Sequence, residues 1–156
     1  MSQRSQRKEE HLALAKMFFN SNKNNDFMHI HLIRPALPES AVSKESIATE
    51  MFGQKISAPF FINAMTGGSD ASYTINRRLA QAAAKENIPM ALGSASILEK
   101  EIDQIKSFEI ARQENPDGLL FANVNPTTKP KVAQKIVQVL NVNALQIHLN
   151  SVQEAV

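Results

Sequence analysis

The sequence has no cysteine and no excess of charge of either sign. The absence of cysteine excludes disulfide bonds and thiolate metal sites, which is typical of a protein from a reducing compartment. Its 17 basic and 15 acidic residues nearly balance, at a net charge of +2. Because proteins that bind nucleic acids usually carry a strong basic field, this balance argues against nucleic acid as the main partner.

Long apolar runs are also missing. Stretches such as "APFF" and "GLLFA" are far too short to span a bilayer, and the polar start "MSQRSQRKEEH" does not fit a signal peptide. We therefore expect a cytoplasmic protein that does not insert into a membrane. The length of 156 residues is enough for one domain with a substantial core.

The chain divides into two parts at residue 57. Residues 1–57 predict an N-terminal extension, in which residues 5–19 form an amphipathic helix and the rest is loop, extended or hairpin-like. Residues 58–156 are regular, with short apolar runs alternating with helical stretches. This alternation is typical of repeating strand–helix units and a parallel α/β sheet.

The apolar runs recur at spacings of 29, 31 and 26 residues between their centres. They are continuous rather than alternating, as expected for strands covered on both faces. The pattern predicts four parallel strands with helices on one side, near residues 59–64, 88–92, 119–123 and 144–149. An open doubly wound sheet fits this pattern, but it would normally cover its last strand. The first half of an eight-stranded TIM barrel, which typically takes about 250 residues, fits slightly better.

Each predicted strand ends in small or polar residues. The first is followed by Thr66-Gly67-Gly68, the second ends at Gly93-Ser94, and the third ends at Asn123. Ligand sites are built at the carboxyl ends of parallel strands, and exposed amides there can bind an anion. Neither a Walker lysine nor a G-x-G-x-x-G motif follows, so an ordinary turn with a helix cap is the alternative for each.

The fourth strand carries the most chemically active group. His148 and Asn150 are two residues apart and so share one face of a strand, and Gln153 and Glu154 follow. A carboxylate beside an amide can hold Mg²⁺ together with phosphate oxygens, although a solvated loop explains the pattern equally well. Near the other end of the chain, the cations of Arg7-Lys8 lie at the start of a helix. Its dipole disfavours positive charge there, so the pair is either a solvated end or an anion contact.

Taken together, these residues resemble the type 2, flavin-dependent isopentenyl-diphosphate isomerases. The matching segments occur in the family's order: "RKEEH" (7–11), "SAPFFINAMTGGS" (57–69), "MALGS" (90–94), "FANV" (121–124) and "ALQIHLNSVQE" (144–154). Members of this family are about twice as long and form one TIM barrel. The resemblance therefore implies that these 156 residues correspond to the N-terminal half of that barrel.

The resemblance also implies roles for particular residues and a set of cofactors. Reduced FMN would contact Met65, Thr66, Gly67, Ser94 and Asn123. The substrate, isopentenyl diphosphate, would contact Arg7, Lys8, Ser94 and Gln153, and it would be isomerised to dimethylallyl diphosphate. Glu154 would bind Mg²⁺, His148 and Asn150 would line the pocket, and NADPH would be the reductant.

The chain departs from the family's pattern at two places. Ala95-Ser96 replaces a common Gln-Arg, and Asn125-Pro126 replaces a common glycine. Since a half-barrel exposes strand edges, we expect a homo-oligomer or pairing with the missing C-terminal half. Two other interpretations stay open, namely a half-barrel fragment without activity of its own and a generic flavin- or nucleotide-binding α/β domain. The absence of a glycine-rich fingerprint counts against the second.

Overall fold

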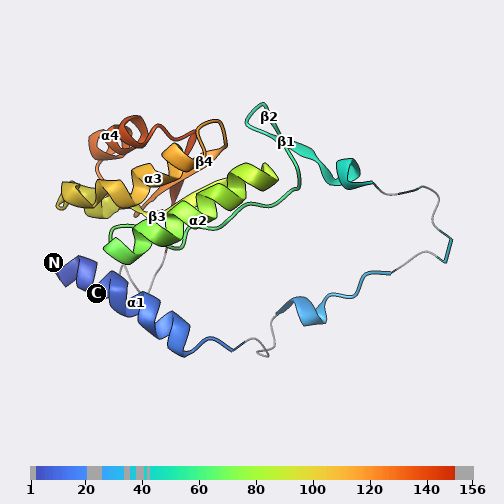
Figure 1. Cartoon of the computed structure of the whole chain (residues 1–156), viewed down its shortest axis with the longest axis horizontal. Coiled ribbons are helices and arrows are strands. Elements are labelled where there is room, and N and C mark those ends of the chain that lie inside the picture. Colours follow the sequence, from blue (N-terminus) through green and yellow to red (C-terminus); the bar gives the residue numbers. More distant parts are fainter. Residues whose placement is uncertain (1–2, 21–25, 34–35, 38–40, 42, 150–156) are drawn as a thin grey trace.

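The computed structural model describes residues 3–20, 26–33, 36, 37, 41 and 43–149 of the chain. Its helices and strands, drawn in Figure 1, are α1 (Gln3–Met17), β1 (Thr49–Met51), β2 (Gln54–Ile56), α2 (Asp70–Glu86), β3 (Met90–Ser94), α3 (Lys106–Glu114), β4 (Leu120–Val124), α4 (Pro130–Leu140) and β5 (Ala144–Ile147). Short 3-10 helices cover Asp26–His29, Lys44–Ile47, Ala95–Glu99 and Ile102–Ile105. The predicted alternation of strands and helices after residue 58 is confirmed.

The main sheet is parallel, with the strand order β3-β4-β5. Helices α2, α3 and α4 lie side by side along it in Figure 1. In the part of the chain that the structure describes, the sheet stays open and does not close into a barrel. The parallel α/β prediction is therefore correct, and the structure shows three strands of the four.

The predicted first strand, residues 59–64, is reduced to one parallel bridge between Ile62 and Met90. Ile62 donates to the carbonyl of Pro89 at 2.9 Å, and its own carbonyl accepts from Ala91 at 2.8 Å. On one side of this bridge, Pro59 has no N–H to donate. On the other side, the backbone N–H of Ala64 is bonded by the Asn63 side chain. The segment therefore lies beside β3 as predicted, but it makes too few hydrogen bonds with β3 to count as a strand.

The two faces of the sheet differ in what covers them. Alternate residues of β3 and β4, including Met90, Leu92 and Leu120, are almost fully buried against the helices in the larger apolar cluster. The opposite, inner face holds a smaller cluster around Ala91 and Phe121. All the covering helices thus lie on one side, which leaves the inner face to other elements.

The hairpin of β1 and β2 covers the first part of the inner face. Its two-residue turn has Phe52 and Gly53 at positive φ, 51° and 75°, as a type I′ hairpin turn requires. The ring of Phe52 meets the ring of Phe121 edge-on at 5.7 Å, and Phe61 meets it at 5.9 Å. These aromatic contacts reach no further along the strand than Phe121. The carboxyl half of the inner face therefore lies beyond them.

Helix α2 has well-defined ends. The side chain of Ser69 accepts a hydrogen bond from the backbone of Ser72 at its start, and Asn87 takes the left-handed conformation at its end. Its buried residues, Asn76, Ala80 and Ala83, recur at helical spacing. The helix is thus fixed in position beside the loop that precedes it.

No helix among the described residues combines the length and the apolar character needed to cross a membrane.

An exposed ion pair joins α2 to α3. Arg77 donates to Glu114 at 2.7 Å and Gln81 donates to it at 2.9 Å. These hydrogen bonds, that of Gln81 first, lower the pKa of Glu114 below its ordinary value of 4.5. A lowered carboxyl pKa stabilises the folded state above the ordinary value, and this stabilisation is lost as the pH falls through the folded-state value.

We therefore expect the melting temperature of Glu114→Gln to fall less steeply than that of the parent as the pH decreases. Thermal unfolding followed by circular dichroism between pH 6 and pH 3 measures this effect, and the difference between variant and parent should shrink towards pH 3. Glu86→Gln, which alters a looser 3.9 Å pair with Lys85, serves as the control. A constant difference between Glu114→Gln and the parent at every pH would contradict this prediction.

Candidate functional site

Polar side chains meet where β3, β4 and β5 end. Ser94 at the end of β3 is in register with Asn123 on β4, which is in register with Gln146 on β5. Asn123 is only 5% exposed, and its amide nitrogen donates to the side-chain oxygen of Gln146 at 3.4 Å. The predicted meeting of Ser94 and Asn123 at one edge of the sheet is therefore observed.

His148 extends this group by one step. Its backbone N–H donates to Val124 at 3.0 Å, so the fourth segment continues beside β4. It follows Gln146 by two residues and shares its face of the strand. Its Nδ1 atom is buried and has no hydrogen-bond partner within the described ranges. A buried imidazole nitrogen without a partner is costly in a protein interior, which marks this position as one suited to a polar ligand.

Gln146 was not predicted as a site residue, although its position in the sequence indicates one. It occupies the same alternating position as His148 and Asn150 within a run otherwise apolar. Asn150, Gln153 and Glu154 lie outside the described residues. Within residues 3–149, leaving out the undescribed gaps, no three acidic or histidine side chains gather as metal ligands, so the predicted role of Glu154 stays a prediction.

The loop after the first segment is held from several sides. The carbonyl of Thr66 accepts from Gly93 at 2.8 Å, and its hydroxyl bonds the side-chain oxygen of Asn76 at 2.5 Å. Asn76 in turn donates to the carbonyl of Ser107 at 2.7 Å, and the Ser107 hydroxyl accepts from Gly68 at 2.8 Å. These buried bonds join the loop to β3, α2 and α3, which makes it a rigid edge of the site.

The two glycines of this loop are required by what surrounds them. A Cβ atom on Gly67 would collide with the ring of Phe108, and Gly68 has a φ of 83°. A side chain is therefore excluded at both positions. The neighbouring Met65, in contrast, is 73% exposed at the loop's outer edge. The Met65 side chain is thus open to a flat ligand approaching over the ends of the strands, whereas Thr66, Gly67 and Gly68 are buried.

Helix α1 reaches this loop from the other end of the chain. The ammonium group of Lys8 donates to the carbonyls of Gly67 and of Ser94, the latter at 3.1 Å, and lies 5.7 Å from the centre of the Phe108 ring. Arg7 is exposed beside it. In Figure 1, α1 runs next to the start of α2. Lys8 is therefore brought to the predicted flavin contacts Gly67 and Ser94, more than 50 residues away in sequence.

The two departures from the family's pattern contact each other. The hydroxyl of Ser96 accepts from the backbone N–H of Asn125 at 3.1 Å and lies 3.0 Å from that of Thr128. Thr128 also donates to the side-chain oxygen of Asn125 at 2.6 Å. Ser96 and Asn125 thus form one polar network that ties the end of β3 to the end of β4, directly beside Ser94 and Asn123.

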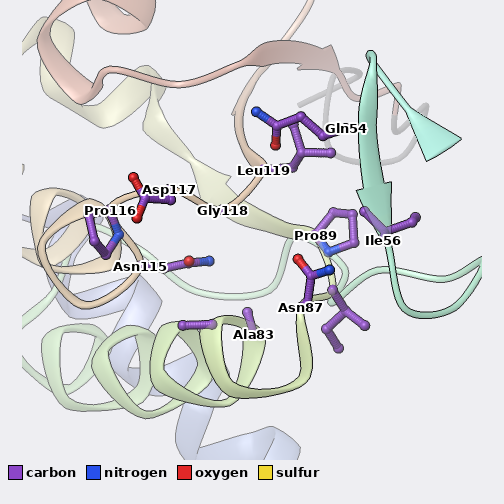
Figure 2. Close-up of a pocket in the computed structure, with 12 residues that line it drawn as sticks. Gln54, Ile56, Ala83, Asn87, Pro89, Asn115, Pro116, Asp117, Gly118 and Leu119 are labelled. Carbon is purple, nitrogen blue, oxygen red and sulfur yellow. The ribbon is translucent and has the colours of Figure 1, made fainter. Parts of the chain in front are cut away.

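A separate cavity of about 200 Å³ lies at the opposite end of the sheet, where the strands begin. Figure 2 shows the amide of Asn115 directed into it, between Ala83 of α2 and the segment that ends at Leu119. The Asn115 nitrogen is buried and without a hydrogen-bond partner among the described residues. Because the polar strand ends and the loop of Thr66 are all at the other end, we do not place the candidate site in this cavity.

The fold and the site define a class of protein: a parallel α/β protein whose candidate site lies at the carboxyl ends of its strands, beside a rigid glycine loop. The family model described as FMN-dependent dehydrogenase matches residues 14–146. The chain belongs to the FMN-dependent dehydrogenase family.

Among curated proteins, the chain is similar to several enzymes named isopentenyl-diphosphate delta-isomerase. It is 40% identical to that of Limosilactobacillus reuteri (strain DSM 20016) over 99% of this chain, 40% identical to that of Latilactobacillus sakei over 97%, and 38% identical to that of Streptomyces sp. (strain CL190) over 96%. The resemblance stated from the sequence motifs is confirmed. The chain spans less than half the length of these relatives, 45%, 44% and 42%.

Proposed function

We propose that these residues form part of an isopentenyl-diphosphate isomerase that uses reduced FMN and Mg²⁺ in isoprenoid biosynthesis. The observation that carries this proposal is the row Ser94, Asn123 and Gln146, in register on adjacent strands beside the loop of Thr66 and Gly67. The names of the similar proteins support the same activity. The Lys8 ammonium at the edge of this row adds a cation for the diphosphate.

The residues on the inner face fit a flavin ring. The polar side chains of Asn123 and Gln146 lie beyond the apolar contacts of Phe121, and the Nδ1 atom of His148, which has no partner among the described residues, would offer a flat group a hydrogen-bonding atom. The exposed Met65 would cover one face of the ring. When bound and reduced, FMN would supply the proton transfer that an unactivated alkene needs, without net oxidation.

The chain's own residues would position the substrate. Arg7 and Lys8 would hold the diphosphate, and Gln153 and Glu154 would add an amide contact and a carboxylate ligand for Mg²⁺. His148 and Asn150 would line the pocket around the reacting end. Binding energy from the diphosphate would thus fix the position of the distant double bond, which is where remote contacts raise the rate of a reaction.

The surroundings of the proposed enzyme follow from this chemistry. NADPH would keep the flavin reduced, and the reaction would take place in the cytoplasm.

The outer edge of β5 has no paired strand among the described residues, and apolar side chains such as Phe60 and Ile147 are more than half exposed. We propose that a second copy or the C-terminal half of the barrel covers them.

The experiment combines the 156-residue chain with the C-terminal half of the Limosilactobacillus reuteri relative. The chain alone should bind FMN more weakly than about 1 µM, because barrels hold the phosphate of a cofactor after strands 7 and 8. The mixture should bind FMN and isomerise isopentenyl diphosphate when NADPH and Mg²⁺ are present. Glu154→Gln should lower that rate by about a hundredfold without changing the affinity for FMN, because the substrate loses its metal bridge.

Flavin fluorescence and product analysis measure these outcomes. Glu99→Gln, an acidic residue on the 3-10 helix after β3, is the matched control and should leave both the rate and the FMN affinity unchanged. A mixture that binds FMN but forms no dimethylallyl diphosphate would instead favour the alternative, a half-barrel without activity. Loss of FMN from the Glu154→Gln mixture would contradict the metal role.

A further inference from the structure

Two adjacent residues of α1 contact different parts of the α/β domain. Lys8 donates to the carbonyls of Gly67 and Ser94, at the edge of the proposed site. The carboxylate of Glu9 accepts from the backbone N–H of Ala71 at 3.1 Å, in the first turn of α2. Figure 1 shows α1 lying alongside the start of α2. The helix is thus held at two points next to each other, one on the site and one on the scaffold.

The Glu9 contact has the character of a fixed anchor. The first N–H groups of a helix have no partner within the helix, and the helix dipole favours an anion beside them. Ser69 accepts from the backbone N–H of Ser72, so Glu9 serves a different N–H group of the same turn. Glu9 is partly buried, and the hydrogen bond to its charged oxygen is of the stronger kind.

The contacts of Lys8 with Gly67 and Ser94 have a different character, because both of these partners are uncharged carbonyl groups. An ammonium bound to carbonyls gains by exchanging them for a diphosphate, which offers full negative charge. A Cβ atom on Gly68 would lie 2.8 Å from the Lys8 nitrogen, so the glycine keeps this place open for the side chain. Lys8 can therefore change partners while the backbone of α1 stays where it is.

Apolar packing contributes little to holding α1. Its second half exposes Leu14 and Met17, at 49% and 75%, and the residues that follow, Phe18 and Phe19, are more exposed than buried. The polar contacts of the first half therefore decide where the helix lies. Removing one of them should change the position of the other.

We propose that Glu9 is a positioning residue. Its carboxylate fixes α1 on the start of α2, and this holds the adjacent Lys8 at the site while Lys8 passes from the carbonyls of Gly67 and Ser94 to the substrate diphosphate. The anchor itself follows from the contacts of this chain. The exchange of partners by Lys8 rests on the proposed function.

Amide hydrogen exchange on the 156-residue chain tests the anchor without any assay of activity. We expect Glu9→Ala to speed exchange in α1 and at Ala71 by about tenfold, and Glu9→Gln, which keeps the accepting oxygen, by about threefold. Glu10→Ala is the matched control, since the Glu10 carboxylate accepts from Gln6 within the same exposed helix. Equal exchange in Glu9→Ala and Glu10→Ala would overturn the proposal.

The positioning role is tested in the mixture with the C-terminal half of the relative. Glu9→Ala should raise the KM for isopentenyl diphosphate about tenfold and leave kcat within about twofold, and Glu9→Gln should recover part of this loss. An unchanged KM in a variant whose α1 exchanges faster would overturn the positioning role. A parent mixture without isomerase activity would refute the proposed function, and with it the exchange of partners by Lys8. The hydrogen-exchange result would still decide whether Glu9 anchors α1.

Discussion

Gly93→Ala is expected to destabilise the chain by about 3 kcal/mol and to remove the flavin site. The added Cβ would lie 2.6 Å from the carbonyl carbon and oxygen of Thr66 and 2.9 Å from its nitrogen. These are backbone atoms, so no side-chain rotation relieves the overlap. The loop of Thr66 must move away from β3, which breaks the 2.8 Å hydrogen bond from Gly93 to the Thr66 carbonyl.

The consequence extends beyond this one bond. Thr66 is joined to α2 through Asn76, and Asn76 is joined to α3 through Ser107, so a displaced loop leaves buried polar atoms without partners. A loss of about 3 kcal/mol corresponds to a fall in melting temperature of roughly 6–12 °C for a chain of this size. In the mixture with the C-terminal half, we expect the affinity for FMN to fall at least about tenfold.

Thermal unfolding and flavin titration of the variant measure both effects. Gly53→Ala is the control, because it also adds a methyl group to a glycine but meets no atom within 4 Å. Its positive φ of 75° costs about 1–2 kcal/mol through backbone strain alone. It should leave the affinity for FMN unchanged. If Gly93→Ala bound FMN as tightly as the parent, the loop of Thr66 would not be the rigid edge of the site.

The sequence was a good guide to the order of elements, and a poorer guide to their lengths. The parallel strands around Met90, Phe121 and Ile147 were predicted because each is an unbroken apolar run between helical stretches. The segment around Phe61 has the same composition, but Pro59 and the side-chain hydrogen bond of Asn63 limit its pairing. Such local competition for backbone donors is invisible to apolar periodicity.

Helix α1 was predicted at residues 5–19 and is found at Gln3–Met17. The predicted amphipathic character describes its composition, but most of its apolar side chains are exposed, as Leu14 and Met17 show, while Leu12 is half-buried. Periodicity indicates which face of a helix is able to pack and not whether a partner is present in the chain. The apolar face of α1 therefore remains open in the structure.

The candidate site was predicted in part for a clear reason. Ser94 and Asn123 lie at strand ends, and parallel strands bring their carboxyl ends together. Asn76 could have been found as well, because a polar residue on the buried stripe of a helix, with Ala80 and Ala83, demands a partner. Glu9 gave no such signal, since a glutamate on a polar helix is ordinary until the helix is docked.

Arg112 was missed for a similar reason, and its substitution should have the largest effect on stability outside the site. Its guanidinium donates to the carbonyls of Asn115, Pro116 and Gly118 at 2.9 to 3.0 Å, all in the loop that leads into β4. It also donates to the carbonyl of Asn141 at 2.9 Å and to the side chain of Asn143 at 3.0 Å, before β5. One side chain thus joins two loops at the beginning of the sheet.

The Arg112 site suits a guanidinium and no other side chain. Partial burial lowers the pKa of Arg112, and the nearby Asp117 acts against this shift. The positive charge is therefore partly desolvated. The guanidinium has five donors in a rigid fork, whereas a lysine ammonium has three, too few for the five acceptors gathered around Arg112. Asn143 also accepts from the N–H of Leu120 at 2.9 Å, so the same contacts help to set the start of β4.

Arg112→Ala is therefore expected to destabilise the chain by about 3–4 kcal/mol, since several charge-assisted hydrogen bonds are lost at once and carbonyls are left unpaired. Arg112→Lys should recover less than half of this loss. Arg77→Ala is the matched control, because it removes the same side chain from a single exposed ion pair with Glu114 and should change stability little. Urea unfolding of the three variants measures the differences. If Arg112→Lys matched the parent, charge alone would hold the two loops, and the fork of hydrogen bonds would not be what joins them.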